Sequence, residues 1–560
     1  MILDFEIKHK DLAARIGILE TNHGKIETPT LLPVVNPNLQ IIPLQELKKF
    51  GTQIFITNSY ILLKNFRDEV LSKGIHGFLG WDGPIMTDSG AYQLMEYGEL
   101  DVSNKDILDF QEKIGVDLGV ILDSPTASRE KSEVGYNLNK TLERMKELKD
   151  FYLSSQSAWC GPIQGIGFPD LLDKSVNFAK KYDFSVYAIG SAVPYLIEYN
   201  YAPIFSTIAH VKSKLPLNRP VHLFGAGHPL IFPFLVALGV DMFDSAAYAL
   251  YAGDGRYMTP TGTMRLEEMF ELPCYCPVCS KYTAKEIKES QDKERLLSEH
   301  NLYISFQEIK TIKLAIRENT LFDLIETRVR AHPSLFHAMP AFLKALRKLR
   351  YLDPISKPHF YYLSEFSKKR IEVLDVKERI KNVESKDTVD LPPFGKVPKT
   401  ILECYPFQRP NYENNYQKIS DISKYWFGLN IFPENVVIVQ SPKTKKIKAV
   451  YQNSELFTVF RASDMQILLH AGARELFKKT KYPHFRVKIK NEIKDFVLNK
   501  KNVFCKFVVD CDKKIRPGQQ VLIVDEEGNL LASGEALLSA REILSFEKGV
   551  AVVPRWVNLN

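Results

Sequence analysis

The chain lacks the long hydrophobic segments of a membrane protein. Its longest apolar run, Pro229 to Val240, contains two prolines and is too short to span a bilayer. The first residues carry a charged side chain at Asp4 and another at Glu6, too early for a secretory signal. We therefore expect a cytoplasmic protein that has no membrane partner.

Cysteine is also scarce, and its placement argues against a disulfide framework. The 560 residues contain 7 cysteines, of which three lie between Cys274 and Cys279. Such crowding favours a metal site in a reducing compartment. No Gly-x-Gly-x-x-Gly turn follows an early strand, which disfavours a dinucleotide-binding fold.

The remaining composition is that of an ordinary globular protein. Hydrophobic residues make up 45% and charged residues 25% of the sequence. A length of 560 residues is too great for one core and predicts several domains. The net charge of +7 fits an anionic partner but is too dilute to identify one.

Short apolar runs recur through the first half of the chain, and each ends on a polar residue or glycine. Amphipathic segments such as 104–114 and 171–181 lie between them. This pattern predicts an α/β fold with a closed (β/α)8 barrel, whose chemistry belongs at the carboxyl ends of the strands. An open doubly wound sheet is the alternative. The runs are 30–36, 54–58, 85–88, 119–123, 162–164, 186–190, 221–225 and 240–244.

Three of these runs end on an aspartate, namely Asp88, Asp123 and Asp244, while Gln164 and Gly190 end two others. Taken alone, Asp88 before a glycine turn could simply cap a helix. Three carboxylates on one rim, however, are costly to assemble unless a ligand, a proton or a metal compensates them. The pattern therefore favours a catalytic rim at the mouth of the barrel.

A second cluster combines Cys274, Cys276 and Cys279 with His300, about twenty residues further on. Three thiolates and one imidazole complete a zinc tetrahedron and leave no open position for substrate, so we interpret the metal as structural. Three buried reduced cysteines without a metal are the alternative, and His300 is a less secure ligand than the thiolates.

Together these segments resemble one family. The stretches are Thr87–Gln93, Gln164-Gly165, Ala188–Pro194, Phe243–Ala249 and the cysteine motif with His300. They resemble the tRNA-guanine transglycosylases over residues 1–350, and the Gly-Ser-Ala-Val-Pro form is similar to the archaeal branch. The resemblance implies replacement of guanine at position 15 of tRNA by 7-cyano-7-deazaguanine on the path to archaeosine. It also implies a homodimer and one structural zinc ion per chain.

The resemblance assigns roles to the rim. Asp244 corresponds to the nucleophile that forms a ribosyl ester, and Asp88 to the general acid and base, although the sequence cannot decide between these two roles. Asp123 would accept the two adjacent donors of the guanine edge. The other expected base contacts are Gln164, Gly190 and Ser191 at O6, Tyr92 stacking on the ring, and Ala192 and Val193 beside the 7-substituent.

The C-terminal part resembles a PUA RNA-binding domain from residue 482 onward, with Arg-Pro-Gly at Arg516 and Gly-Glu-Ala at Gly534. We predict a catalytic domain over 1–350, small α+β modules over 351–481 and a β-barrel PUA domain over 482–560. The candidate RNA contacts are Arg256, Lys500, Lys501, Lys506, Lys513, Lys514 and Arg516, although the lysines could equally serve solubility.

Two other functions remain open at this point. A non-catalytic RNA-binding paralogue or accessory subunit would share the fold, but it would not need both Asp88 and Asp244. A metal-dependent barrel hydrolase would place open zinc ligands at strand ends. The thiolates stand outside the strand pattern, which disfavours a hydrolase.

Overall fold

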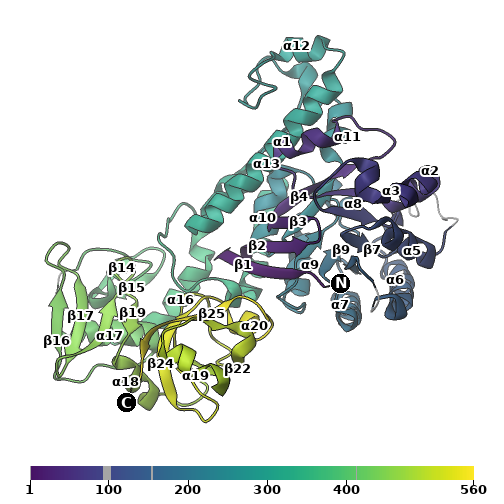
Figure 1. Ribbon diagram of the computed structural model, residues 1–560. Helices are drawn as coiled ribbons and strands as arrows, with labels where there is room; N and C mark the ends of the chain where they lie inside the picture. Colours follow the sequence, from purple (N-terminus) through teal and green to yellow (C-terminus); the bar gives the residue numbers. More distant parts are fainter. Residues whose placement is uncertain (1, 92–101, 153–154, 412, 560) are drawn as a thin grey trace. The chain divides into compact units, whose positions relative to one another are not determined.

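The computed structural model describes residues 2–91, 102–152, 155–411 and 413–559 (Figure 1). The chain divides into two compact units. The first comprises Met1–Arg317 and Thr327–Leu349, and the second comprises Glu318–Glu326 and Arg350–Asn560. The boundaries of the three predicted domains remain predictions.

The first unit contains the predicted barrel. Its parallel strands close in the order β10-β11-β4-β5-β6-β7-β8-β9, which confirms the closed barrel and excludes the open sheet. Nearly every strand residue is buried, because helices cover the outside of the barrel and side chains fill its inside. The strands are β4 (Thr30–Val35), β5 (Phe55–Asn58), β6 (Ile85–Asp88), β7 (Leu118–Val120), β8 (Ala158–Ile163), β9 (Val186–Ile189), β10 (Val221–Leu223) and β11 (Met242–Ser245).

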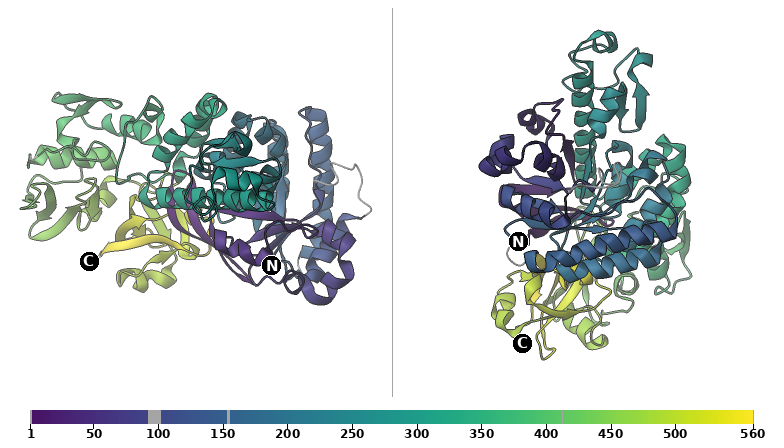
Figure 2. Two further views of the ribbon diagram at one scale, coloured as in Figure 1. Left: turned by 90° about the horizontal axis from the view of Figure 1, so that it is seen from above. Right: turned by 90° about the vertical axis from the view of Figure 1, so that its right-hand side faces the viewer.

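Helices connect these strands and surround the barrel in two further views (Figure 2). The expected segment 104–114 is helical because Ser103 forms a capping box with Asp106 and Gly115 ends the helix in a left-handed conformation. The helices of this region are α1 (Leu47–Phe50), α2 (Ser59–Asn65), α3 (Arg67–Leu79), α5 (Asn104–Ile114), α6 (Lys131–Tyr152), α7 (Pro169–Ala179), α8 (Val193–Ile197), α9 (Tyr201–Lys212), α10 (Phe232–Ala237) and α11 (Ala247–Gly253).

Further elements of the first unit precede and follow the barrel. An antiparallel sheet of β1 (Asp4–Asp11), β2 (Ala14–Thr21) and β3 (Gly24–Thr28) comes before β4, and the sequence analysis did not anticipate it. After the barrel come the hairpin β12 (Arg256–Thr259) and β13 (Gly262–Arg265), then α12 (Ala284–Glu289), α13 (Lys293–Glu318) and α15 (Pro333–Lys348). Phe342 of α15 packs edge-on against Phe205 of α9.

The second unit contains three sheets and their helices, of which the first sheet is a hairpin of β14 and β15. The β16-β17-β18-β19 sheet is followed by a strand-rich, barrel-like sheet of order β21-β25-β24-β23-β20-β22. The helices are α14 (Leu321–Arg328), mostly in this unit, α16 (Ile371–Ile380), α17 (Tyr416–Phe427), α18 (Gly472–Lys479), α19 (Lys494–Leu498) and α20 (Ala540–Ile543). The strands are β14 (Thr388–Leu391), β15 (Gly395–Pro398), β16 (Val437–Gln440), β17 (Ile447–Gln452), β18 (Glu455–Phe460), β19 (Ile467–Leu469), β20 (Arg486–Ile489), β21 (Val503–Phe504), β22 (Val508–Cys511), β23 (Gln520–Val524), β24 (Leu530–Ala536) and β25 (Val550–Val557).

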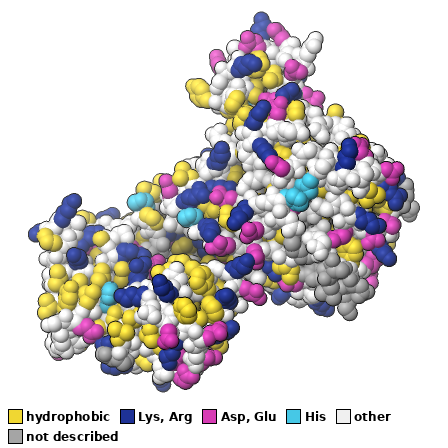
Figure 3. Space-filling view, viewed as in Figure 1, with side chains coloured by type: hydrophobic (Ala, Val, Ile, Leu, Met, Phe, Trp, Pro, Cys, Tyr) yellow, Lys and Arg dark blue, Asp and Glu magenta, His cyan; other side chains and the backbone are white. Residues whose placement is uncertain are grey.

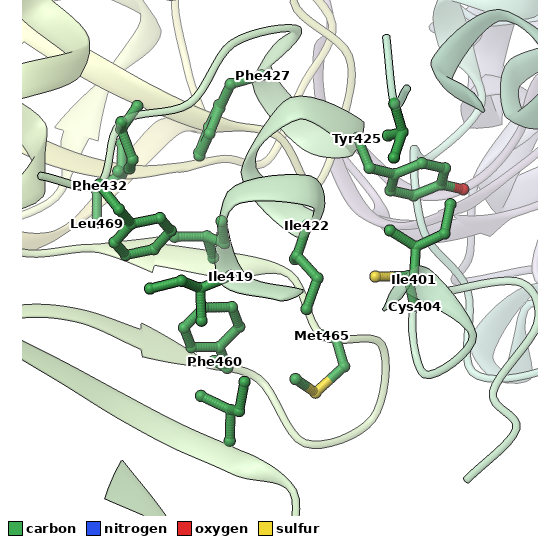
Figure 4. Packing of buried hydrophobic residues seen from close by; sticks show 14 of the residues in the cluster. Ile401, Cys404, Ile419, Ile422, Tyr425, Phe427, Phe432, Phe460, Met465 and Leu469 are labelled. Atoms are coloured by element: carbon green, nitrogen blue, oxygen red, sulfur yellow. The ribbon is translucent and has the colours of Figure 1, made fainter. Parts of the chain in front are cut away.

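Helix α17 organises the core of the second unit (Figure 4). Its residues Ile419, Ile422 and Tyr425 are completely buried and point into a cluster that also contains Phe460 and Met465. The Tyr425 hydroxyl donates to the Tyr405 carbonyl at 2.8 Å, so this buried polar group is satisfied. None of the helices among the described residues combines the length and hydropathy that crossing a bilayer requires.

Candidate active site and metal centre

The three predicted aspartates lie together at the carboxyl end of the barrel. Asp88 is the last residue of β6, Asp123 follows β7, and Asp244 belongs to β11. Asp123 and Asp244 are buried and Asp88 is partly buried. Asp88 interacts electrostatically with both of the others, as the rim prediction requires.

Asp88 is held at one oxygen. Its Oδ1 accepts hydrogen bonds from Asn58 Nδ2 at 2.8 Å and from the Gly90 backbone N–H at 2.7 Å. Burial raises the pKa of Asp88 to about 7, opposed by the Gly90 bond and assisted by the negative charges of Asp244 and Asp123. A carboxyl group with this pKa can hold or release a proton at neutral pH.

Asp123 is supported by Gln164, which follows β8, and by Thr141 and Arg144 of α6. Gln164 donates from Nε2 to Asp123 Oδ2 at 2.9 Å, and the Thr141 hydroxyl donates to Gln164 Oε1 at 2.9 Å, which fixes the orientation of the amide. Burial raises the pKa of Asp123 to about 6, and the Arg144 guanidinium and Gln164 limit that rise. Arg144 also donates to the Asp123 carbonyl at 2.9 Å.

Thr141 and Arg144 were missed by sequence reasoning. They are three residues apart on α6 and therefore lie on the same side of that helix. This spacing was the available signal, but the sequence does not indicate which strand end the helix would face.

Gly190 leaves room beside Asp123. A Cβ atom at this position would lie 3.5 Å from Asp123 Oδ2, in the space next to the carboxylate. The Gly190 N–H already donates to the Ile163 carbonyl at 2.9 Å, so it is engaged in the barrel rather than free for a base. Ser191 follows in a left-handed conformation, and its hydroxyl accepts from the Thr126 N–H at 3.3 Å.

A small pocket opens beside these residues. Gln164 and Ser191 line it together with Ser124, Thr126, Ser128, Val134, Asn137, Gly165, Ile166 and Tyr195. Of the two residues expected beside a 7-substituent, Ala192 is completely buried, whereas Val193 is half-buried and packs against Gly225. Tyr92, the expected stacking residue, lies outside the described residues.

Asp244 accepts two hydrogen bonds at Oδ1. His222 Nε2 lies 2.6 Å from this oxygen, and the Gly225 N–H donates to it at 3.2 Å. Gly225 has a φ of 75°, and a Cβ there would lie 2.2 Å from Val193 Cγ2, so glycine is required for this close approach. His222 was not among the site residues predicted from the sequence.

The four predicted metal ligands converge. The ligand atoms of Cys274, Cys276, Cys279 and His300 all lie within 4.8 Å of one another. His300 Nε2 bonds the Met258 carbonyl at 2.9 Å, which leaves Nδ1 facing Cys276 Sγ and Cys279 Sγ at 3.5 and 3.3 Å. A closed Cys3His set of this kind, with its imidazole oriented by a carbonyl, fits a structural metal ion.

A second group, His23, His76 and Asp117, differs from this cluster although its ligand atoms also lie within 4.8 Å of one another. The two imidazole rings are stacked 3.6 Å apart at an angle of 23°. Their in-plane lone pairs therefore run side by side instead of converging on one ion. Because His23 Nδ1 lies 2.9 Å from Asp117 Oδ1, we interpret the group as two imidazoles that share a carboxylate.

The candidate RNA contacts of the C-terminal sheet divide into two kinds. Lys500, Lys501, Lys506, Lys513 and Lys514 are all exposed. Arg516 is not available in the same way: its side chain is 11% exposed and pairs with Asp375 at 2.6 Å. The guanidinium also donates to the Asp353 carbonyl at 2.9 Å. Its assignment as an RNA contact is therefore corrected, because these internal partners already use its donors.

Arg256, the candidate RNA contact of the first unit, begins β12, and the Met258 carbonyl of the same strand bonds the metal ligand His300. Its guanidinium pairs with Asp254 and lies 4.1 Å from the centre of the Tyr251 ring. Over the visible face of the molecule, basic side chains are interspersed with acidic ones (Figure 3). That face presents no continuous basic surface.

The fold and site define a (β/α)8-barrel enzyme with an acidic mouth and a separate Cys3His metal centre. Residues 10–334 match the family described as queuine tRNA-ribosyltransferase. Residues 417–483 match the patch-forming domain C2 of tRNA-guanine transglycosylase, and residues 485–557 match the PUA domain. The chain belongs to the tRNA-guanine transglycosylase family and is a tRNA-ribosyltransferase.

Its curated relatives match along their whole length. A protein of Pyrococcus furiosus named tRNA-guanine(15) transglycosylase is 42% identical over 99% of this chain and 98% of its own. Proteins of the same name are 39% identical in Thermococcus kodakarensis, over 98% of both chains, and 38% identical in Methanocaldococcus jannaschii, over 99% of both.

Proposed function

We propose that this enzyme replaces guanine at position 15 of tRNA with 7-cyano-7-deazaguanine, a step toward archaeosine. The observation that carries the proposal is the mouth itself: two carboxylates suited to double displacement, Asp88 and Asp244, beside a third, Asp123, whose Oδ2 lies next to Gly190. The printed names of the relatives supply the tRNA position. A non-catalytic paralogue would have no use for this set of uncompensated charges.

Asp123 recognises the base in this proposal. Its two oxygens match the adjacent N1–H and exocyclic amine donors of guanine and of its 7-deaza analogue. Gln164 holds the carboxylate and keeps a second Nε2 hydrogen for O6. The Ser191 N–H is the backbone donor proposed beside it, since the Gly190 N–H is occupied. The half-exposed Val193, next to buried Ala192, offers an apolar boundary for a neutral nitrile.

The exchange proceeds through a ribosyl-aspartate ester. Asp244 attacks C1′ of the nucleotide while Asp88 gives its proton to the departing guanine. The incoming base then transfers a proton to Asp88 and attacks C1′, and Asp244 departs. Two inversions give net retention, as in a retaining glycosidase. The raised pKa of Asp88 supports its role as the group that carries the proton.

The metal ion is proposed to be zinc, held by Cys274, Cys276, Cys279 and His300 in a structural role. When bound, it links the segment after β13 to α13. Elemental analysis is expected to find one zinc ion per chain, and chelation is expected to lower the melting temperature. A metal-free protein with unchanged melting temperature would contradict this assignment.

The zinc segment also suits a homodimer interface. Phe270 is 93% exposed and Tyr275 97% exposed, which is unusual for aromatic side chains on a monomer surface. Hydrophobic side chains are exposed at the end of the unit that carries α12 (Figure 3). Sedimentation of Tyr275→Asp beside the wild type tests the dimer, which the variant is expected to weaken.

The exposed lysines of the C-terminal sheet are proposed to contact tRNA phosphates in a cytoplasmic enzyme. Lys500→Glu with Lys501→Glu is expected to weaken tRNA binding and to lower its salt dependence by about two counterions. Arg555→Glu is the control, because it reverses a charge on the same sheet at a residue that already pairs with Glu535. Equal salt slopes in wild type and double variant would contradict RNA binding by Lys500 and Lys501.

Radiolabelled guanine exchange tests the central proposal. The wild-type enzyme is expected to incorporate guanine into a tRNA transcript with G15 and to fail with a transcript that carries another base there. Unlabelled 7-cyano-7-deazaguanine should displace the label irreversibly. Equal incorporation into both transcripts would contradict the assigned position.

A further inference from the structure

One histidine at the mouth lies against the proposed nucleophile. His222 belongs to β10 and is completely buried. Its Nε2 lies 2.6 Å from Asp244 Oδ1, and the Gly225 N–H donates to the same oxygen at 3.2 Å. Asp244 Oδ2, in contrast, has no hydrogen-bond partner within the described ranges. The two oxygens of Asp244 therefore have different environments.

The second ring nitrogen decides which atom carries the proton. His222 Nδ1 is buried and has no hydrogen-bond partner in the described part of the chain. An imidazolium would bury an unused N–H donor there, which costs more than an unused acceptor lone pair. A protonated Asp244 that donates to Nε2 would also place a proton on Nδ1. The favoured arrangement is a neutral ring that donates its Nε2–H to a charged Asp244.

We propose that His222 is a positioning residue for Asp244 in the base exchange, an inference that rests on the proposed function. Its N–H, with that of Gly225, occupies Oδ1 and fixes the orientation of the carboxylate. Oδ2 is then the oxygen that reacts with the ribose.

The same bond serves both halves of the reaction. In the first, an electron pair of Oδ2 forms the bond to C1′ and the C1′–N9 bond breaks. Guanine leaves with the electron pair of the C1′–N9 bond and takes the proton of Asp88. In the second, N9 of the incoming base gives its proton to Asp88 and its electron pair to C1′. The electrons of the Oδ2–C1′ bond return to Asp244, whose charge His222 again stabilises.

Other ionisable groups near Asp244 do not duplicate this role. Asp88 on β6 and Cys160 on β8 interact with its charge. Asp88 has the same sign when ionised, and burial raises the pKa of the Cys160 thiol well above its ordinary value, so it stays neutral. β4, the other neighbour of β11 in the barrel, contains no ionisable residue.

Three variants test the proposal in steady-state guanine exchange by the full-length enzyme. His222→Phe keeps a ring but removes the donor, and kcat is expected to fall about 10- to 100-fold, the effect of one hydrogen bond to a charged group, with little change in the KM for guanine. His222→Gln, whose amide reaches the position of Nε2, should restore most of the rate, whereas the shorter His222→Asn should not.

The melting temperature of each variant separates positioning from folding. A folded His222→Phe enzyme with wild-type kcat would overturn the proposal. If that variant does not fold, equal rates for the Gln and Asn variants would overturn it. Failure of the wild type to exchange guanine would instead overturn the proposed function, so the two failures are distinguishable.

Discussion

Buried aspartates occur at both ends of the barrel, but their surroundings differ. At the amino ends of the strands, Asp241 precedes β11 and Asp117 precedes β7. Arg15 pairs with both oxygens of Asp241, each at 2.8 Å, and Asp117 is shared by His23 and His76 and also accepts the Ile85 N–H at 2.9 Å. At the carboxyl ends, the charged neighbours of Asp88 are Asp244 and Asp123, and Arg144 only partly offsets the burial of Asp123.

This difference reverses the direction of the pKa shifts. Burial alone would raise the pKa of every one of these groups. At the amino ends, Arg15 and Lys212 outweigh burial and leave the pKa of Asp241 lowered, and His76, the Ile85 N–H and His23 do the same for Asp117. At the mouth, burial prevails, and the pKa is about 7 for Asp88 and about 6 for Asp123.

Burial therefore does not distinguish functional from structural carboxylates in this barrel. What distinguishes them is whether their partners outweigh burial, as they do at Asp241 and Asp117 but not at Asp88 and Asp123. Compensated groups hold the barrel together, whereas the mouth retains charges that disfavour folding and that only substrate or a proton can relieve.

The largest expected effect is at the mouth. Asp244→Asn removes the nucleophile, and exchange is expected to fall at least 1,000-fold, on the order seen when a catalytic nucleophile is lost. The melting temperature should stay near that of wild type, because the Asn side chain keeps an oxygen that can accept from His222 and Gly225. Denaturing gels should show a covalent tRNA adduct for wild type alone. An adduct that forms in Asp244→Asn would assign the nucleophile elsewhere.

The matched change at the opposite end should affect stability instead. Asp241→Asn leaves buried Arg15 without its partner, and about 3–5 kcal/mol of unfolding free energy is expected to be lost, the usual effect of breaking a buried pair. Urea denaturation measures the loss, and exchange per folded molecule should remain near wild type. If Asp241→Asn were as stable as wild type, the compensated character of this end would be wrong.

The pH dependence should separate the two ends on opposite sides of neutrality. Because the folded pKa of Asp88 is about 7, kcat/KM is expected to decline as pH rises through about 7 and the acid loses its proton. Asp241 and Asp117 have lowered pKa values, so the stability they provide is complete above the ordinary aspartate range and is lost only as pH falls below it. A parallel loss of activity and of melting temperature above pH 7 would contradict this separation.

The smallest effect should come from the cation nearest the mouth. Arg144 opposes the upward pKa shift of Asp123, so Arg144→Met is expected to raise that pKa further. The KM for guanine should increase several-fold at pH 6 and less at pH 8, since a protonated Asp123 loses one acceptor for the base. Arg144→Lys, which keeps the charge, is the control. An increase in KM that is independent of pH would indicate a purely steric role.

The fold of the first unit and most of its site were predictable because their signals are local. Each barrel strand is a short apolar run that ends on a polar residue, and the closed barrel then brings Asp88, Asp123 and Asp244 to one end without further information. The cysteine motif likewise identifies a metal ligand set from spacing alone. The β1–β3 sheet escaped prediction because its alternation is irregular and only its burial pattern shows which side faces the barrel.

From the sequence alone it was clear which residue types lie at the strand ends and in the metal loop. A short apolar run that ends on a polar residue and a Cys-x-Cys-x-x-Cys spacing are both properties of the chain itself. Tertiary structure alone decided how each charge is compensated. His222 reaches Asp244 from another strand, Arg15 reaches Asp241 across more than two hundred residues, and Arg516 is occupied by Asp375 rather than free for RNA. A pKa depends on distances of a few ångströms between such groups, and no linear spacing encodes those distances.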